Sequence, residues 1–392
     1  MPARRNWLLS ALLAIGVCGM GLRFWLAKVS IGSDDASIWF DHAQLIATRG
    51  VGYAYTHPEF GIYKFNHPPL MGYWSVLALS FSGGDLQRFS WGIKAPGLLV
   101  ELLTSFLVWR IWSKQGSAVA AAALAAYATC LASIEVSGFH GNTDSACAGL
   151  TLLAFYVFKE KRRPFLSGLV LALALNVKII PLLVVPVLLA QCHSPRDAFR
   201  FCGGLSLALV PFLPFVLIAP PLIYSTVFAY NPSPLEWGLY HFLESGDEVA
   251  PLAGHLSGVM RWFIRDGRYL VMLGSSLLGV VAFFKPTRFA YHLGAAALAL
   301  FLVLTPGFAA QYTVYVVPLL FAADYRRAAV YGLFAGLMIT FIYTARMQFE
   351  FPLRTLVQYY PIPRLSQLFG VLAWGSLVGY LLAIRKKLAA AH

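Results

Sequence analysis

The residues whose types and spacing could do chemistry lie mainly in one polar stretch, residues 31–70. Its acidic and imidazole side chains include six that are useful to chemistry: Asp34, Asp35, Asp41, His42, His57 and His67. The chain has only 17 Asp plus Glu, and ionisable groups beside a membrane segment are costly. A partly desolvated carboxylate can accept a proton from an attacking hydroxyl, so Asp35, and second Asp34, are candidate bases. Alternatively, the stretch is a solvated loop in which Ser33 or Asp34 caps a helix that begins near Ala36.

Three further polar sites interrupt apolar segments. They offer His140, Asn142 and Asp144 in SGFHGNTDS (137–145), Lys178 after Asn176-Val177, and Gln311, Tyr312 and Tyr315 in TPGFAAQYTVY (305–315). A lysine between short apolar helices can bind a phosphate, or it can reach along the apolar surface to water. Asn142 or Asp144 could instead cap the helix that follows. If all four sites lie on one side of a membrane, they suit an anionic, lipid-borne donor and a hydroxyl acceptor.

The composition places these sites in a polytopic membrane protein. Of 392 residues, 59% are hydrophobic and 12% are charged, against about 25% charged in soluble domains, and the mean hydropathy is +0.68. The net charge of +13 is gathered in short clusters between apolar runs, which argues against nucleic-acid binding. The five cysteines lack paired or metal-ligand spacing, and no metal or other cofactor is expected.

The elements that position these residues are helices, and the charge pattern orients them. Residues 7–27 are interpreted as a retained signal anchor, with Arg4 and Arg5 expected in the cytoplasm and the following loop outside. The short apolar segment 68–83 is interpreted as a re-entrant or surface helix, because a crossing there would put every later basic cluster outside. These clusters are Arg110/Lys114, Lys159 to Arg163, Arg196/Arg200, Lys285/Arg288, Arg326/Arg327 and Arg385 to Lys387.

We therefore expect an all-α protein of about twelve transmembrane helices, with both termini inside and residues 1–392 forming one transmembrane domain. The spans after the first are predicted at 91–112, 117–138, 145–158, 164–177, 179–191, 201–223, 268–284, 289–304, 312–323, 328–345 and 367–384. Several are too short to cross lipid alone, which is tolerable where their ends open into a water-filled cavity. The external loops are then 31–90, 224–266 and about 346–366, and 31–90 is the catalytic loop with juxtamembrane helices.

Five short motifs, in order over about residues 7–320, resemble those of the GT-C class of membrane glycosyltransferases. Asp35-x-x-x-Trp39, with Arg49-Gly50 and Tyr53-x-Tyr55 behind it, resembles a pattern of the polyprenyl-phosphate-mannose-dependent enzymes. Asn66-His67-Pro68-Pro69-Leu70 resembles an element of the dolichyl-phosphate-glucose-dependent enzymes. Three are similar to motifs of both groups: His140-Gly141-Asn142-x-Asp144, Val177-Lys178-x-x-Pro181, and Gln311-Tyr312-x-x-Tyr315-x-x-Pro318. Asn142 stands where Gln is usual, and Tyr315 where Trp is common.

The resemblance implies a GT-C-like bundle and an inverting transfer of a hexose, mannose or glucose, from a polyprenyl-phosphate donor. The acceptor would be a hydroxyl of a lipid-linked molecule or glycan on the external or lumenal face. Asp35 (Asp34 second) would be the base, and the donor phosphate would be bound by Lys178, His140, Gln311 and Tyr312. Residues expected to bind sugar or acceptor are Trp39, His67, Tyr55, Asn142 and Asp144.

One alternative from another class is a transporter or flippase of a lipid-linked sugar, which would need the phosphate site but not the carboxylate base. Such a protein must at some time open inward, whereas an enzyme needs an opening on one side only. The Ala-rich chain without long loops favours a bacterial inner membrane over the endoplasmic reticulum. The expected partners are the donor, the acceptor and membrane lipid, and not nucleic acid.

Overall fold

The computed structural model describes residues 2–56, 65–218, 220–229, 237–238, 253–285, 287–346 and 362–390. His57, about half of the predicted second external loop and most of the predicted third lie outside these residues. Helices joined by short turns make up the described chain, and no strand occurs in it, so the expected all-α class is confirmed. The chain divides into two compact units, one formed by residues 1–182 and 192–230, the other by 183–191 and 231–392. Each unit is described by itself.

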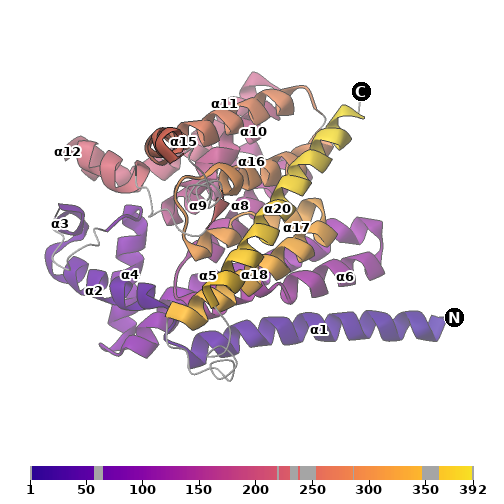
Figure 1. Ribbon diagram of the computed structural model, residues 1–392, viewed down its shortest axis with the longest axis horizontal. Helices are drawn as coiled ribbons and strands as arrows, with labels where there is room; N and C mark the ends of the chain where they lie inside the picture. The colour runs from indigo at the N-terminus through magenta and orange to yellow at the C-terminus, as the bar shows by residue number, and fades with distance from the viewer. Residues whose placement is uncertain are drawn as a thin grey trace. The chain divides into compact units, whose positions relative to one another are not determined.

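The first unit begins with a long apolar helix and the segments that follow it. They are α1 (Pro2–Val29), α2 (Asp34–Arg49), α3 (Val51–Thr56), α4 (Pro69–Ser82) and α5 (Leu86–Trp112), followed by a short turn, η1 (Ser113–Gln115). Helix α4 corresponds to the predicted segment 68–83, and Pro69 occupies its first turn, where a missing N–H costs nothing. Helices α2 and α4 pack against each other (Figure 1). The predicted external loop is therefore largely helical.

The rest of the first unit contains two breaks that matter for the site. Its elements are α6 (Ser117–Ala128), α7 (Leu131–Ile134), the π-helical turn η2 (Glu135–His140), α8 (Asp144–Lys161), α9 (Pro164–Val177), α11 (Pro195–Ser206), η4 (Leu207–Phe212), α12 (Leu213–Ile218), α13 (Pro220–Ile223) and η5 (Tyr224–Phe228). Helices α1 and α6 run side by side (Figure 1). One break, at residues 141–143, separates η2 from α8, and the other follows α9, so that polar residues are left at helix ends.

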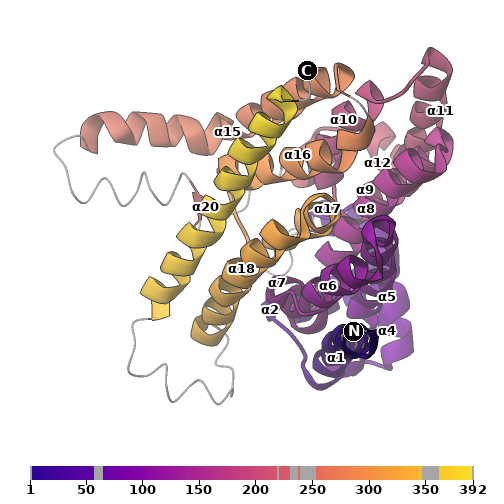
Figure 2. The ribbon, with the colours of Figure 1, turned by 90° about the vertical axis from the view of Figure 1, so that its right-hand side faces the viewer.

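The second unit is also helical, and one of its elements straddles the division. Its elements are the end of η3 (Ile180–Val184), α10 (Val185–Ala190), α15 (Ala253–Phe283), η6 (Thr287–Phe289), α16 (Ala290–Leu304), η7 (Ala310–Val314), α17 (Val317–Ala323), α18 (Tyr325–Arg346) and α20 (Ile362–Ala389). Figure 2 shows α18 and α20 side by side, and their Phe341 and Phe369 rings stack with centroids 5.6 Å apart. The break expected at 305–315 is present between α16 and α17.

The predicted count of about twelve spans is not confirmed. Six described helices are long and apolar enough to cross a membrane, or up to eight if each of two bent pairs is one span. Ser117–Ala128 and Leu131–His140 form one bent pair, with an angle of 53°. Three further apolar helices are shorter: Pro164–Val177, Ile180–Ala190 and Ala310–Ala323. At about 1.5 Å per residue, none of these three covers the ~30 Å hydrocarbon layer alone.

A buried polar network joins α1, α5 and the break between α6 and α7. Arg23 and Glu101 are both buried, and the Arg23 Nε lies 3.4 Å from Glu101 Oε2. The guanidinium donates to the backbone carbonyls of Tyr127 (3.0 Å) and Ala128, where α6 ends. The Tyr127 and Ser133 hydroxyls donate to the two Glu101 oxygens at 2.7 and 2.8 Å. This network satisfies carbonyls that a helix break leaves without helical partners.

Candidate active site

The start of α2 presents two neighbouring aspartates differently. Ser33 is the N-cap, and its hydroxyl accepts from the backbone N–H of Asp35 at 3.2 Å. The helix therefore begins at Asp34 rather than near Ala36, and Ser33 rather than Asp34 caps it. Asp34 is exposed, whereas the Asp35 side chain is only 30% exposed. Asp35 thus combines partial shielding with access from outside the protein.

Two residues from the break before α8 hold the Asp35 carboxylate. Asn142 Nδ2 donates to Asp35 Oδ2 at 2.6 Å, and His140 Nε2 lies 3.1 Å from the same oxygen. Both residues are buried, and both are more than 100 positions away in the chain. The alternative in which Asn142 or Asp144 caps α8 is wrong, because Thr143 is the N-cap residue and makes no side-chain capping bond. The predicted motif His140-Gly141-Asn142 therefore meets the predicted base directly.

The backbone around this contact requires glycine at two positions. Gly32 has φ +113°, and a Cβ there would lie 2.7 Å from Phe139 O and 2.8 Å from His140 O. Gly141 has φ +84°, and its Cβ would lie 3.2 Å from the Ala36 Cβ. These close approaches let the Ser33 N–H and hydroxyl both donate to His140 O, at 2.9 and 2.8 Å. The end of η2 and the start of α2 are therefore fixed to each other by backbone contacts.

A second charged pair lies at the ends of two other helices. Lys178 follows the last residue of α9 in an extended conformation, and its Nζ donates to Asp144 Oδ1 at 2.8 Å. Asp144 is fully buried in the first turn of α8, where the helix dipole favours a carboxylate, and Lys178 is 15% exposed. The Cys147 thiol approaches the Lys178 carbonyl at 3.8 Å. Asp144 thus fixes the position of the lysine ammonium.

The electrostatic balance at Asp35 favours the charged carboxylate. Burial raises its pKa, but attraction and hydrogen bonding from His140, attraction from Lys178 and the hydrogen bond from Asn142 together lower it below its ordinary value of 3.8. Burial lowers the pKa of His67 well below 6.5, an effect to which Lys178 adds. At neutral pH the site therefore contains ionised Asp35 and neutral His67.

The aromatic residues predicted to bind sugar pack together beside α2. Trp39 is 3% exposed, with its ring centroid 4.4 Å from that of His67 and 5.9 Å from that of Phe65. Tyr55 is fully buried, and its hydroxyl donates to the His67 carbonyl at 2.6 Å. His42 is also buried against Phe65. In this arrangement the rings stabilise the segment that ends in Pro68-Pro69, and the sugar-binding roles of Trp39, Tyr55 and His67 stay predictions.

The structure does not place every predicted site residue beside Asp35. Gln311 is half-buried and Tyr312 is buried, both in η7 of the second unit, where the Tyr312 and Tyr315 ring centroids lie 5.4 Å apart. Their proposed contact with a donor phosphate stays a prediction. The residues brought together within the first unit are Asp35, His140 and Asn142 as one group, and Asp144 and Lys178 as another.

Two residues of α5 that lie outside the predicted motifs hold the chain just before α2. Lys94, fully buried, donates to Ser30 O at 2.7 Å and to the Ser30 hydroxyl at 3.2 Å. The Ser90 hydroxyl donates to the carbonyl of Ile31. A lysine within a predicted span is a recognisable signal in the sequence, because such residues are rarely tolerated there without a partner.

The comparisons with known proteins support a membrane glycosyltransferase of the GT-C type. Residues 66–224 match the family described as dolichyl-phosphate-mannose-protein mannosyltransferase, which confirms the resemblance to the GT-C class. No curated protein gives a significant match. The matched segment includes His140, Asn142, Asp144 and Lys178, and it begins after Asp35. Together with the long apolar helices, the match indicates an integral membrane protein.

Proposed function

We propose that this protein is an inverting hexosyltransferase that moves mannose or glucose from a polyprenyl-phosphate donor to a hydroxyl acceptor on the external side of its membrane. The observation that carries the proposal is the Asp35 carboxylate, partly exposed and held by His140 and Asn142. The ion pair of Asp144 and Lys178 belongs to the same unit, and Lys178 is close enough to lower the pKa of Asp35. This transfer needs a carboxylate that accepts the proton of the attacking hydroxyl and a cation that binds the phosphate.

In the proposed reaction, Asp35 accepts the proton of the acceptor hydroxyl as its oxygen attacks the anomeric carbon. The new C–O bond forms while the bond from that carbon to the phosphate oxygen breaks, and polyprenyl phosphate leaves with the electron pair. One carboxylate suffices for this inverting step, whereas retaining chemistry uses a second carboxylate as nucleophile. Lys178 would stabilise the added negative charge on the leaving phosphate.

The residues around the two charges have positioning roles in this proposal. Asn142 and His140 both act on Oδ2 of Asp35, which fixes the orientation of the carboxylate. Asp144 holds the ammonium of Lys178 at the end of α9, and an ammonium has three N–H donors with which to meet a phosphate as well as a carboxylate. We keep Gln311 and Tyr312 as further proposed donors to the phosphate, and Trp39, Tyr55 and His67 as proposed sugar-binding residues.

The family description gives a reason to test mannose first. It names dolichyl-phosphate-mannose as the donor and protein as the acceptor of the family whose model matches residues 66–224. Polyprenyl-phosphate-mannose is therefore our first choice of donor, and polyprenyl-phosphate-glucose the second. The acceptor is proposed as a hydroxyl of a lipid-linked molecule, a glycan or a protein.

The test is sugar transfer by the purified protein in nanodiscs, with each donor and a mixed acceptor extract of membrane lipids, glycans and proteins. We expect one donor to be consumed, and Asp35→Asn to lose about 10²-fold or more in rate, the scale of a lost general base. Asp41→Asn, a half-buried aspartate on the same helix, is the matched control and should keep the activity. The rate of sugar transfer by Lys178→Ala should fall as that of Asp35→Asn does.

Two outcomes would overturn parts of this proposal. If Asp34→Asn loses activity while Asp35→Asn keeps it, the base is Asp34, the exposed neighbour. If the wild type binds a donor but transfers neither sugar, while it moves the intact donor across the bilayer, the protein is a transporter of the lipid-linked sugar and not an enzyme.

A further inference from the structure

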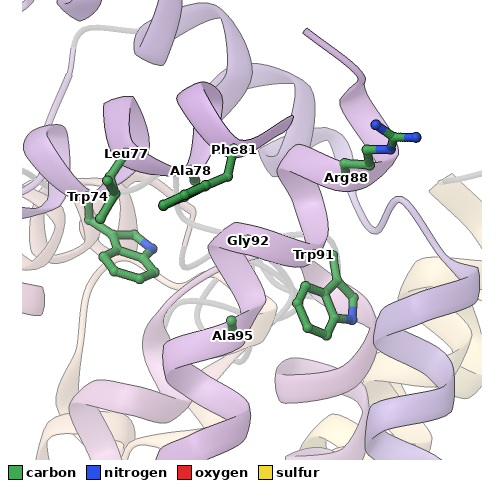
Figure 3. A pocket seen from close by; sticks show the side chains of 8 residues that line it. All are labelled: Trp74, Leu77, Ala78, Phe81, Arg88, Trp91, Gly92 and Ala95. Atoms are coloured by element: carbon green, nitrogen blue, oxygen red, sulfur yellow. The ribbon is translucent and has the colours of Figure 1, made fainter. Parts of the chain in front are cut away.

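A groove with a volume of about 430 Å³ lies between α4 and α5, within the first unit (Figure 3). Figure 3 shows that side chains of both helices line it. The small residues Ala78, Gly92 and Ala95 form its floor. Large apolar residues, among them Leu77, Phe81 and Trp91, form its walls.

The floor of the groove is where the two helices touch. A Cβ placed on Gly92 would lie 3.1 Å from the Ala78 Cβ, so α4 and α5 approach closely at this point. The side chains of the walls stand out from this contact: Phe81 is 81% exposed, Trp91 46% and Leu77 44%. Such exposure of large apolar side chains in water is unfavourable, and it indicates that an apolar medium or molecule covers them.

One end of the groove is basic. Arg88 is exposed in the first turn of α5, while Ala95 lies two turns further along the same helix. The candidate span containing α5 runs Leu86–Gln115, so Arg88 lies near the end of the span and Ala95 deeper in it. The nearest carboxylate in sequence, Asp85, is engaged at the N-cap, where its Oδ1 accepts from the Arg88 backbone N–H at 2.7 Å. None of the lining residues is acidic.

We propose that this groove binds one anionic phospholipid of the surrounding bilayer, with an acyl chain along Ala78, Gly92 and Ala95 and the phosphate at Arg88. An apolar trough with a cation at its interfacial end matches the two parts of such a lipid. An arginine binds phosphate through paired N–H groups, and a tryptophan such as Trp91 is suited to the headgroup level. The bound lipid fills the space between the juxtamembrane helix α4 and the span α5. This site is separate from glycosyl transfer and does not depend on it.

The test is native mass spectrometry of the purified full-length protein, exchanged into equal amounts of dioleoyl-phosphatidylglycerol and dioleoyl-phosphatidylcholine. We expect one phosphatidylglycerol to be retained preferentially. Arg88→Gln should lower the ratio of retained anionic to zwitterionic lipid about fivefold, the effect of one basic residue near a lipid surface. Arg110→Gln removes the same charge from the other end of α5 and should leave the ratio unchanged.

A second pair of variants tests the apolar part of the groove. Ala95→Leu adds volume to the floor and should reduce retention of both lipids. Leu99→Phe, at an exposed position one turn further along α5 and outside the groove, should not. Equal retention of the two lipids by the wild type, or equal effects of Arg88→Gln and Arg110→Gln, would overturn the proposal. Capture of a polyprenyl phosphate instead of the phospholipid, when both are offered, would also overturn it and assign the groove to a substrate.

Discussion

Asp35 lies among groups that favour its charged form, and this has a consequence for the pH dependence of activity. His140, Lys178 and Asn142 outweigh burial and lower its pKa below 3.8. A group with a lowered pKa loses its charge only when the pH falls through that lowered value. We therefore expect kcat/KM to show no acid limb from Asp35 between pH 7 and pH 5.

Removal of His140 should raise the pKa of Asp35. His140→Phe removes the attraction and the hydrogen bond by which His140 lowers the pKa of Asp35, and it leaves burial, which raises that pKa. The acid limb of kcat/KM should then move up by about one pH unit or more. His42→Phe is the control, because His42 is a buried histidine of α2 packed on Phe65. If His140 acts only on the donor phosphate, His140→Phe will lower kcat/KM equally at every pH.

At the scale of the residue, the sequence indicates candidate site residues but not which groups their side chains contact. Asp35, His140, Asn142, Asp144 and Lys178 were all recognisable, because polar groups at the ends of apolar segments are costly. Their pairing was not predictable, because it depends on how helices far apart in the chain come together. Asp144, predicted to bind sugar or acceptor, pairs with Lys178, and His140, predicted to bind phosphate, faces Asp35.

At the scale of the element, the junction between η2 and α2 fixes the distance from His140 to Asp35. Gly32→Ala would strain a backbone at φ +113° and drive a Cβ into two carbonyl oxygens. Strain of this kind costs about 1–3 kcal/mol, and a displacement of about 1 Å can reduce a rate about 10²-fold. We expect kcat to fall by about tenfold or more, measured below the inactivation temperature of the variant.

A matched glycine separates strain from displacement. Gly116, between η1 and α6, has φ +112°, and a Cβ there would meet nothing within 4 Å. Gly116→Ala should therefore lower thermal stability through backbone strain but keep the wild-type kcat. An equal loss of kcat in the two variants would show that strain alone, and not the position of Asp35, explains the effect.

Sequence patterns do not predict where the helices end in the segment after α5. The hydropathy of segment 117–138 predicts one span, but the chain breaks after Ala128 and bends by 53°. Neither Arg23 nor Glu101 was predicted to matter. A buried arginine is tolerated there because the break supplies carbonyl acceptors and Glu101 supplies the opposite charge. A hydropathy value averaged over the whole of segment 117–138 cannot detect a turn within it. The polar groups of that turn are satisfied by another helix, so the composition of the segment stays apolar.

At the scale of the whole molecule, charge and hydropathy gave the all-helical membrane class but not the number of crossings. Lengths near the limit of the bilayer, such as Pro164–Val177, do not decide between a span and a half-span. The orientation of the longer helices is a separate question. It rests on the basic residues at their ends, since cytoplasmic loops carry an excess of Lys and Arg.

The orientation of α5 tests the external placement of the site. Arg110 and Lys114 lie at its C-terminal end, so that end should be cytoplasmic and the turn after α4 external. In a background without the five native cysteines, Ser80→Cys should react with a membrane-impermeant maleimide in intact cells. Gln115→Cys, also exposed, should react only after permeabilisation. Activity of both variants would show that the fold is kept. The reverse labelling pattern would place α2 and Asp35 on the cytoplasmic side and exclude an external donor site.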